Sequence, residues 1–178
     1  MSELIQLLRD KSVQFGTFTL ASGKTSDFYV DARQTTLNGR GSLLVARAVM
    51  QTLRDDVVAV GGMTLGADPI ACSTATLAAT MGRPLHAFLI RKEAKDHGTG
   101  RTVEGMANLP EGSKVAIVED TTTTGGSLLR AVESAQAAGL DVVQCITVVD
   151  REEGARERIE GAGHPFVALV TRSDLEAS

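Results

Sequence analysis

The chain has 178 residues, of which 18 are basic and 22 are acidic, so its formal net charge is −4. This length fits one domain over residues 1–178, and 43% apolar with 22% charged residues is an ordinary globular composition. The acidic balance and an aromatic content of 3% argue against a nucleic-acid binder, because phosphate contacts need basic residues and single-strand readers need stacking rings.

The first 40 residues combine a helical pattern with an extended one. Ser2 is expected to cap a short amphipathic helix, whose apolar face begins at Leu4. The segments 15–20 and 28–30 are extended and flank a turn that contains Gly23, so they predict a hairpin.

Strand and helix patterns alternate through the rest of the chain. Asp68 is expected to cap one of the helices, with Pro69 at its first position. The predicted elements are helices at 41–53, 68–81 and 127–138 and strands at 57–60, 85–90, 114–118, 142–149 and 166–170. Such an alternation predicts an α/β fold with a mostly parallel sheet that helices cover on both faces.

The two cysteines and the distribution of charge indicate a cytoplasmic protein. Cys72 and Cys145 lie in apolar stretches, so we expect two buried, reduced residues and neither a disulfide nor a metal site. The start of the chain lacks a secretory pattern, and the longest uncharged stretch, 69–82, has 14 residues, too few to span a bilayer. We therefore expect neither a membrane nor a nucleic-acid partner.

The strongest functional motif lies at 115–132, where a buried strand leads into Glu119 and Asp120, four threonines, two glycines and a serine. Glycines and hydroxyl groups at a helix N-terminus suit a phosphate. The two carboxylates would repel a phosphate but can accept hydrogen bonds from the vicinal hydroxyls of a ribose. The motif predicts a ribose-phosphate site, since a solvated turn needs neither two acids nor four threonines.

Two further segments follow predicted strands. Residues 91–105 are polar and glycine-punctuated and gather several cations, so they suit a mobile lid over a polyphosphate, with a solvated charge run as the alternative. The segment GGMTLGADP at 61–69 offers backbone amides to a second phosphate, although a glycine-rich connection fits it almost as well.

Together these segments resemble the type I phosphoribosyltransferases, whose signature is an acid-acid, Thr-rich, Gly-Gly loop that binds 5-phosphoribosyl 1-diphosphate. The lid RKEAKDHG, the segment DREEG and the stretch FTLASGKTSDFYVDAR are similar to the orotate phosphoribosyltransferases within that family. The resemblance implies the type I fold, with residues 1–40 as an N-terminal hood and 91–105 as a catalytic lid. It also implies transfer of ribose 5-phosphate to orotate in pyrimidine biosynthesis, giving orotidine 5′-phosphate and diphosphate.

The resemblance implies roles for individual residues. Lys95, His97 and Asp120 would be catalytic, and Thr123 and Arg151 would bind orotate. Mg²⁺ is implied as a cofactor held mainly by the substrate, with no dedicated protein ligands, and a homodimer is implied in which lid residues serve the neighbouring subunit. The residues implied for binding 5-phosphoribosyl 1-diphosphate are Arg91, Lys92, Lys95, His97, Glu119, Asp120, Thr121, Thr122, Thr123, Thr124, Gly125, Gly126 and Ser127.

Several positions depart from the family pattern or remain open. Many members carry a basic residue near Leu65 and Gly66, and this chain has none there. Lys24 and Tyr29 are further candidates at the mouth of the site, with a turn lysine and a hairpin core residue as the alternatives. Two other functions also remain open: a purine phosphoribosyltransferase, and a non-catalytic RNA-binding regulator on the same fold.

Overall fold

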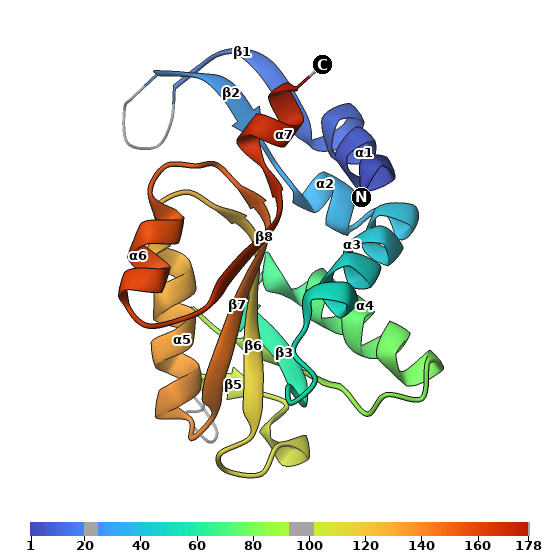
Figure 1. The fold of residues 1–178 in the computed structure, drawn as a ribbon, viewed down its shortest axis with the longest axis vertical. Helices are drawn as coiled ribbons and strands as arrows, with labels where there is room; N and C mark the ends of the chain where they lie inside the picture. Colours follow the sequence, from blue (N-terminus) through green and yellow to red (C-terminus); the bar gives the residue numbers. More distant parts are fainter. Residues whose placement is uncertain (20–24, 93–101, 178) are drawn as a thin grey trace.

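A six-stranded sheet forms the centre of the computed structural model, which describes residues 1–19, 25–92 and 102–177 (Figure 1). Its strands are β3 Ala59–Met63, β4 His86–Ile90, β5 Val103–Glu104, β6 Lys114–Thr122, β7 Asp141–Asp150 and β8 Phe166–Thr171. They lie in the order β5-β4-β3-β6-β7-β8, and every pair is parallel except the short β4–β5 pair. The predicted α/β fold with a mostly parallel sheet is confirmed.

Helices cover both faces of this sheet (Figure 1). On one face lie α3 Gly39–Thr52 and α4 Ala67–Thr80, with α1 Ser2–Ser12 packed against α3; on the other lie α5 Gly126–Ala137 and α6 Ala155–Gly161. Each face has its own apolar cluster, one around Val45 and Ile70 and the other around Leu128 and Ile159. Burial of these two clusters is the main force that holds the layers together.

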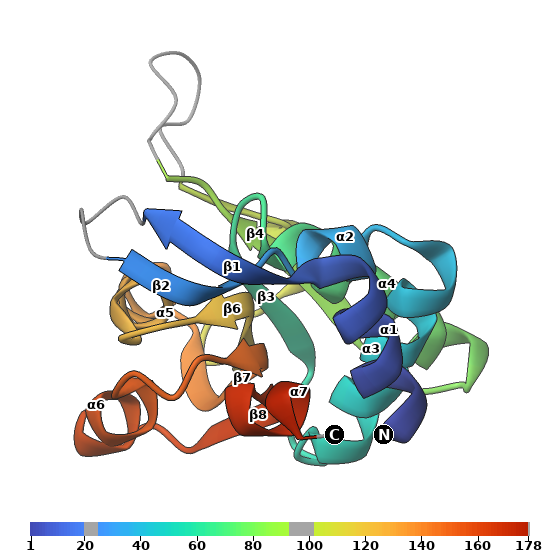
Figure 2. The same ribbon diagram turned by 90° about the horizontal axis from the view of Figure 1, so that it is seen from above.

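The N-terminal hairpin lies over one end of the sheet (Figures 1 and 2). It consists of β1 Val13–Thr19 and β2 Thr25–Val30, which pair antiparallel as predicted and form a separate sheet. Two short helices flank it, α2 Arg33–Thr36 directly after β2 and α7 Arg172–Glu176 at the C-terminus. Arg9 of α1 donates hydrogen bonds to backbone carbonyls of α7 and its flank, so α1 and α7 lie side by side (Figure 1).

The strand order reverses direction between β3 and β6. From β3 the chain proceeds to β4 on one side, whereas β6 leads to β7 and β8 on the other side. At such a switch point the connections after neighbouring strands diverge and leave a crevice at the carboxyl ends of the strands. The topology therefore places the candidate site after β3 and β6.

Two predicted helix caps were wrong. The helix α1 begins at Ser2 with Met1 as N-cap, and α4 begins at Ala67 with Gly66 as N-cap, so neither Ser2 nor Asp68 has a capping role. At Gly66 the backbone is already helical, with φ −62° and ψ −41°. The helix therefore takes up Asp68 and Pro69 in its first turn, where a proline lacking an N–H is tolerated.

At two places where the sequence predicts a loop, the structure has a strand. Residues 103–104 pair with β4 as a short antiparallel strand, although the sequence predicts a loop there. The strand β6 continues to Thr122, four residues beyond its apolar run, because its backbone keeps pairing with β7 as far as Asp150.

The cysteines divide between the core and the surface. Cys145 is buried as predicted, but Cys72 is exposed on α4, so the prediction that both are buried was wrong for Cys72. None of the helices in the described part of the chain is long and apolar enough to cross a membrane.

Candidate functional site

A cavity of about 350 Å³ lies at the switch point between β3 and β6. Three segments that the sequence singles out separately contribute to it: the glycine-rich segment 61–69, the motif at 115–132 and, through Lys92, the predicted lid at 91–105. The lining residues are Arg33, Met63, Thr64, Leu65, Gly66, Lys92, Glu119, Asp120 and Ser127.

The two acids of this cavity are held in different ways. Glu119 accepts a hydrogen bond of 3.0 Å from the Thr122 hydroxyl group and another from Ser127. Asp120 accepts one of 2.9 Å from the backbone N–H of Thr121. Burial raises the pKa of both carboxyl groups, and neither has an ion-pair partner among the residues that the structure describes. Such acceptors suit neutral hydroxyl donors such as those of a ribose.

The threonine- and glycine-rich turn leads directly into α5. Thr123 and Thr124 follow the end of β6, and Gly125 is the N-cap residue with φ 75°, a left-handed conformation that favours glycine. A Cβ atom at Gly125 would also lie 3.0 Å from the side chain of Ile159, a tight contact that adds to the conformational preference for glycine here. The first amide groups of α5 have no partner within the helix, and their position beside the acids suits a phosphate.

The segment after β3 closes the cavity from the side of α4. The backbone N–H of Thr64 donates to the carbonyl of Ile90 at 2.9 Å, which ties the segment to the end of β4. A Cβ atom at Gly66 would collide with the carboxylate of Asp120. The absence of a side chain at Gly66 therefore lets the segment approach the acidic end of β6.

The predicted lid is only partly described. Lys92 lines the cavity, as the sequence predicts for a phosphate contact, but Arg91 does not. The guanidinium group of Arg91 pairs with Glu104 at 2.8 Å. Lys95 and His97 lie outside the described residues, so their predicted roles stay predictions.

The residues predicted to bind orotate lie at the same edge of the sheet, outside the lining of the cavity. The backbone N–H of Arg151 donates to the carbonyl of Thr122 at 2.9 Å, which places Arg151 one strand from Thr123. The Arg151 side chain is largely buried, pairs with Glu153 at 2.9 Å and lies 6.0 Å from the ring centre of Phe28. The hairpin and the end of β7 therefore meet at Arg151.

The structure describes one of the two hairpin residues that are candidates at the mouth of the site, Tyr29, but not the other, Lys24. Tyr29 is 38% exposed, and its ring lies 5.5 Å from that of Phe18, so it is a surface residue of the hairpin and not a core residue. Lys24 lies outside the described residues.

One lining residue, Arg33, is missing from the sequence prediction. It opens α2, which the sequence does not predict, and reaches the cavity from the N-terminal region. The sequence signals are its position at the end of the stretch FTLASGKTSDFYVDAR, which resembles the family, and two residues after Asp31.

Comparisons with known proteins extend the similarity over nearly the whole chain. A model of the family described as phosphoribosyl transferase domain matches residues 39–163. A protein of Streptomyces coelicolor named orotate phosphoribosyltransferase is 48% identical over 177 residues, which are 97% of this chain and 95% of that protein.

Solved structures give the same result. The orotate phosphoribosyltransferase of Mycobacterium tuberculosis in complex with Fe(III) dicitrate has a TM-score of 0.86 and 44% identity, covering 99% of this chain and 98% of that one. The complex of that enzyme with 5-phospho-alpha-D-ribosyl 1-diphosphate has a TM-score of 0.82 and 40% identity, with the same shares covered. The similarity therefore includes the N-terminal hood as well as the sheet and its cavity.

Proposed function

The chain belongs to the phosphoribosyltransferase family, and from this premise we propose that it transfers ribose 5-phosphate from 5-phosphoribosyl 1-diphosphate to orotate. The products are orotidine 5′-phosphate and diphosphate. The observation that carries the proposal is the cavity at the switch point, where two partly buried acids lie beside a glycine-rich helix start. Relatives at 48% identity over nearly the full length favour orotate over a purine base and catalysis over a regulatory role.

The reaction forms a bond between a ring nitrogen of orotate and the anomeric carbon as the bond from that carbon to the diphosphate oxygen breaks. The electron pair of the broken bond leaves with diphosphate, and the ribose passes through a state with positive charge near the ring oxygen. The ring nitrogen gives up its proton to the departing diphosphate, so that atoms and charges balance. Glu119 and Asp120 hold the ribose hydroxyl groups, and their negative charge stabilises that state. The turn from Thr121 to Ser127 holds the 5-phosphate.

The two remaining groups are the leaving diphosphate and the base. We assign Lys92 to the diphosphate because it lines the cavity, and we keep Lys95 and His97 as the lid residues that meet it. Thr123 and Arg151 remain the residues proposed to bind orotate. Arg151 offers a planar fork of donors that matches a carboxylate.

Mg²⁺ is part of the proposal. The donor chemistry fits it, because the oxygen atoms of Glu119 and Asp120 are hard ligands beside a site for phosphate groups. In the described residues no group of three or more His, Cys, Asp or Glu side chains could hold a metal ion. The proposed ion is held mainly by substrate oxygen atoms. When bound, it neutralises negative charge on the diphosphate.

We also propose a homodimer, and an apolar surface beside the cavity supports it. Leu37 and Leu65 are each 72% exposed. Leu37, Pro69 and Cys72 line both a groove between α3 and α4 and an adjoining groove between the α2 region and the start of α4, and Leu65 lines the second of these. Leu65 also lines the cavity, so a second copy on this surface would lie next to the site. Large exposed apolar patches of this kind mark interfaces.

A light-scattering measurement on a sizing column tests the dimer. The wild type is expected to have twice the mass of one chain, and Leu37→Glu is expected to have the mass of one chain. Met81→Glu is the control, since Met81 is 66% exposed but does not line either groove. A wild-type protein with the mass of one chain would contradict the proposal.

The reaction itself is tested by following orotate consumption in the presence of 5-phosphoribosyl 1-diphosphate and Mg²⁺. Orotate is expected to react, while adenine, hypoxanthine and uracil in parallel assays are not. Omission of Mg²⁺ is expected to abolish turnover. Reaction with a purine would identify the protein as a purine phosphoribosyltransferase instead. No reaction with any base would favour the non-catalytic, RNA-binding regulator.

We also propose a cytoplasmic location, which the two free cysteines favour.

A further inference from the structure

The charges of the cavity are balanced, and Arg33 supplies half of the positive charge. Among the lining residues, Arg33 and Lys92 are the cations and Glu119 and Asp120 the acids. The segment 61–69 adds no cation from the other side. Without Arg33 the charged groups of the lining would sum to −1, and an anionic ligand would meet net repulsion.

The carboxylate of Asp31, two residues before the start of α2, fixes the orientation of Arg33. One oxygen of Asp31 accepts hydrogen bonds from Nε of Arg33 at 2.8 Å and from its backbone N–H at 3.2 Å. The other oxygen accepts one from the side chain of Gln34 at 3.2 Å. Asp31 therefore binds the Nε edge of the guanidinium group and does not use its two terminal amino groups.

The other edge of the guanidinium group is open to a ligand. Its terminal amino groups make no hydrogen bond to another residue in the described part of the chain, and the side chain is 47% exposed. Two such amino groups in one plane match two oxygen atoms of a phosphate. The group is thus fixed in orientation, charged and accessible from the cavity.

We propose that Arg33 binds the diphosphate of 5-phosphoribosyl 1-diphosphate and that Asp31 is the residue that positions it, an inference that rests on the proposed function. Negative charge grows on the diphosphate as its bond to the anomeric carbon breaks. A cation already in place stabilises that charge without reorganisation. The N-terminal region in this way supplies the positive charge that the segment 61–69 lacks.

A different role for Arg33 makes different predictions. Arg33 also lies close enough to Asp120 to favour the charged form of that carboxylate and to lower its pKa, against the larger effect of burial. If Arg33 only positioned Asp120, its loss would weaken every ligand that carries the ribose. If Arg33 binds the diphosphate, its loss weakens the ligands that carry diphosphate and spares orotidine 5′-phosphate.

Calorimetric titration of the full chain separates these roles. Arg33→Gln is expected to weaken the binding of diphosphate with Mg²⁺ by about 10- to 100-fold, the effect of losing a charged hydrogen bond. Binding of orotidine 5′-phosphate is expected to change by less than about threefold, which lies within ordinary variation between variants. Equal losses for both ligands, or a loss for orotidine 5′-phosphate alone, would overturn the proposal.

Three further variants complete the experiment. Asp31→Asn is expected to weaken diphosphate binding less than Arg33→Gln does, and Arg33→Lys, which keeps the charge without the fork, is expected to lie between wild type and Arg33→Gln. If Arg33→Gln does not fold, the test rests on Arg33→Lys, because unchanged diphosphate binding by Arg33→Lys would overturn the proposal. Arg40→Gln is the control, because Arg40 also pairs with an acid, Glu3, but does not line the cavity.

The titration with diphosphate needs no orotate. A wild-type protein that fails to consume orotate would therefore overturn the proposed function, while the comparison between wild type and Arg33→Gln would still give its own result. The two proposals can fail separately.

Discussion

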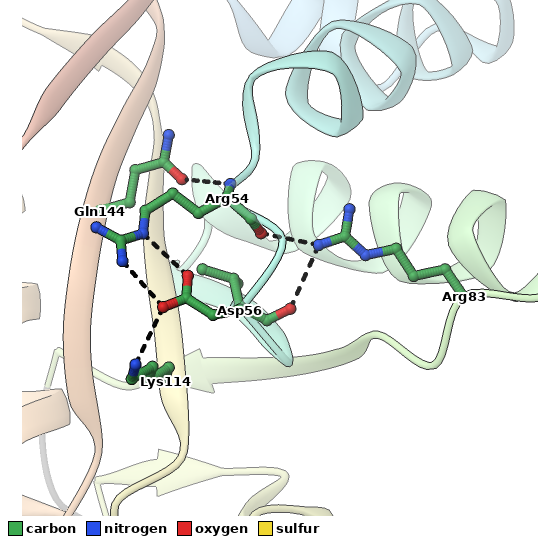
Figure 3. Close-up of polar contacts among 6 residues, drawn as sticks. Arg54, Asp56, Arg83, Lys114 and Gln144 are labelled. Atoms are coloured by element: carbon green, nitrogen blue, oxygen red, sulfur yellow. Dashed lines mark hydrogen bonds and ion pairs between the residues drawn. The ribbon is translucent and has the colours of Figure 1, made fainter.

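At the amino ends of the parallel strands the acid Asp56 is surrounded by partners, whereas at the carboxyl ends Glu119 and Asp120 have no ion-pair partner among the described residues. Asp56 accepts two hydrogen bonds of 2.9 Å from the guanidinium group of Arg54 and one of 3.1 Å from Lys114 (Figure 3). These hydrogen bonds, that from Arg54 first, hold the pKa of Asp56 well below its ordinary range.

Backbone groups at the amino ends have partners as well (Figure 3). Gln144 accepts from the backbone N–H of Arg54 at 3.1 Å, and Arg83 donates to the carbonyl of Arg54 at 2.9 Å. At the other end of the same sheet, burial raises the pKa of Glu119 and Asp120. One end of the sheet therefore uses its charges to join strands and helices, while the other end keeps charges available for a ligand.

Neutralising an acid at the carboxyl end should produce the largest effect on activity. Asp120→Asn keeps the shape and can still accept the hydrogen bond from Thr121, but it removes the negative charge beside the reacting ribose. We expect kcat/KM to fall by about 100- to 1,000-fold, the cost of losing one electrostatic contact in a transition state. The melting temperature should stay the same or rise, since a desolvated charge is removed. Near-normal turnover would contradict the assignment of Asp120.

A methyl group at Gly66 should act on the same acid indirectly. Gly66→Ala places a Cβ atom against the carboxylate of Asp120, so the acid or the segment after β3 must move. We expect kcat/KM to fall by about 10- to 100-fold, as small displacements of reacting groups are costly. Gly161→Ala is the matched control, because a Cβ atom there meets nothing within 4 Å, and its activity should equal that of the wild type. Equal activities of the two variants would contradict the close approach.

The sequence was sufficient for the local parts of this site. The apolar runs predict the strands of the parallel sheet, and the run of acids, threonines, glycines and a serine from Glu119 to Ser127 identifies the functional motif before α5. The structure places Glu119, Asp120 and Ser127 of this motif in the lining of one cavity. These features depend on neighbours in sequence, through strand burial, backbone freedom and helix termini. They can therefore be predicted without knowledge of the whole fold.

The missed features depend on contacts between distant segments. The end of β6 could not be predicted because pairing with β7, and not its own polar residues, decides where it stops. Arg33 reaches the cavity only because the hairpin and α2 lie against the sheet, which no local pattern shows. The predicted caps were wrong because Ser2 is already the first residue of α1, and the backbone is helical from Gly66, two residues before Asp68.

The two ends of the sheet should respond to pH with opposite sign. Burial raises the folded-state pKa of Asp120, so the folded protein binds this proton more readily than the unfolded chain. The unfavourable contribution is present above the folded pKa and fades as the pH falls through the folded pKa toward an unfolded value near about 4. Urea unfolding at pH 4 to 8 should show Asp120→Asn to be more stable than wild type at pH 7, by an amount that shrinks toward acid. A difference that does not vary with pH would contradict this.

The smallest effect on stability is expected from Asp56→Asn. The ion-pair partners of Asp56 are exposed to solvent, and exposed ion pairs contribute little to the free energy of unfolding. Its pKa is lowered on folding, so its favourable contribution is present above the unfolded pKa and is lost as the pH falls below about 4. Asp56→Asn should lower the melting temperature at pH 7 by at most about 3 °C and leave kcat/KM unchanged.

The matched control for Asp56 is its neighbour Asp55, which makes no hydrogen bond or ion pair with the side chains that the structure describes. Asp55→Asn should change neither the melting temperature nor the activity, so the pair of variants isolates the contacts with Arg54 and Lys114 from the loss of one negative charge. A fall in kcat/KM for Asp56→Asn without a fall for Asp55→Asn would mean that the amino ends of the strands influence the cavity. The separation of the two ends into one that stabilises the fold and one that binds the ligand would then be wrong.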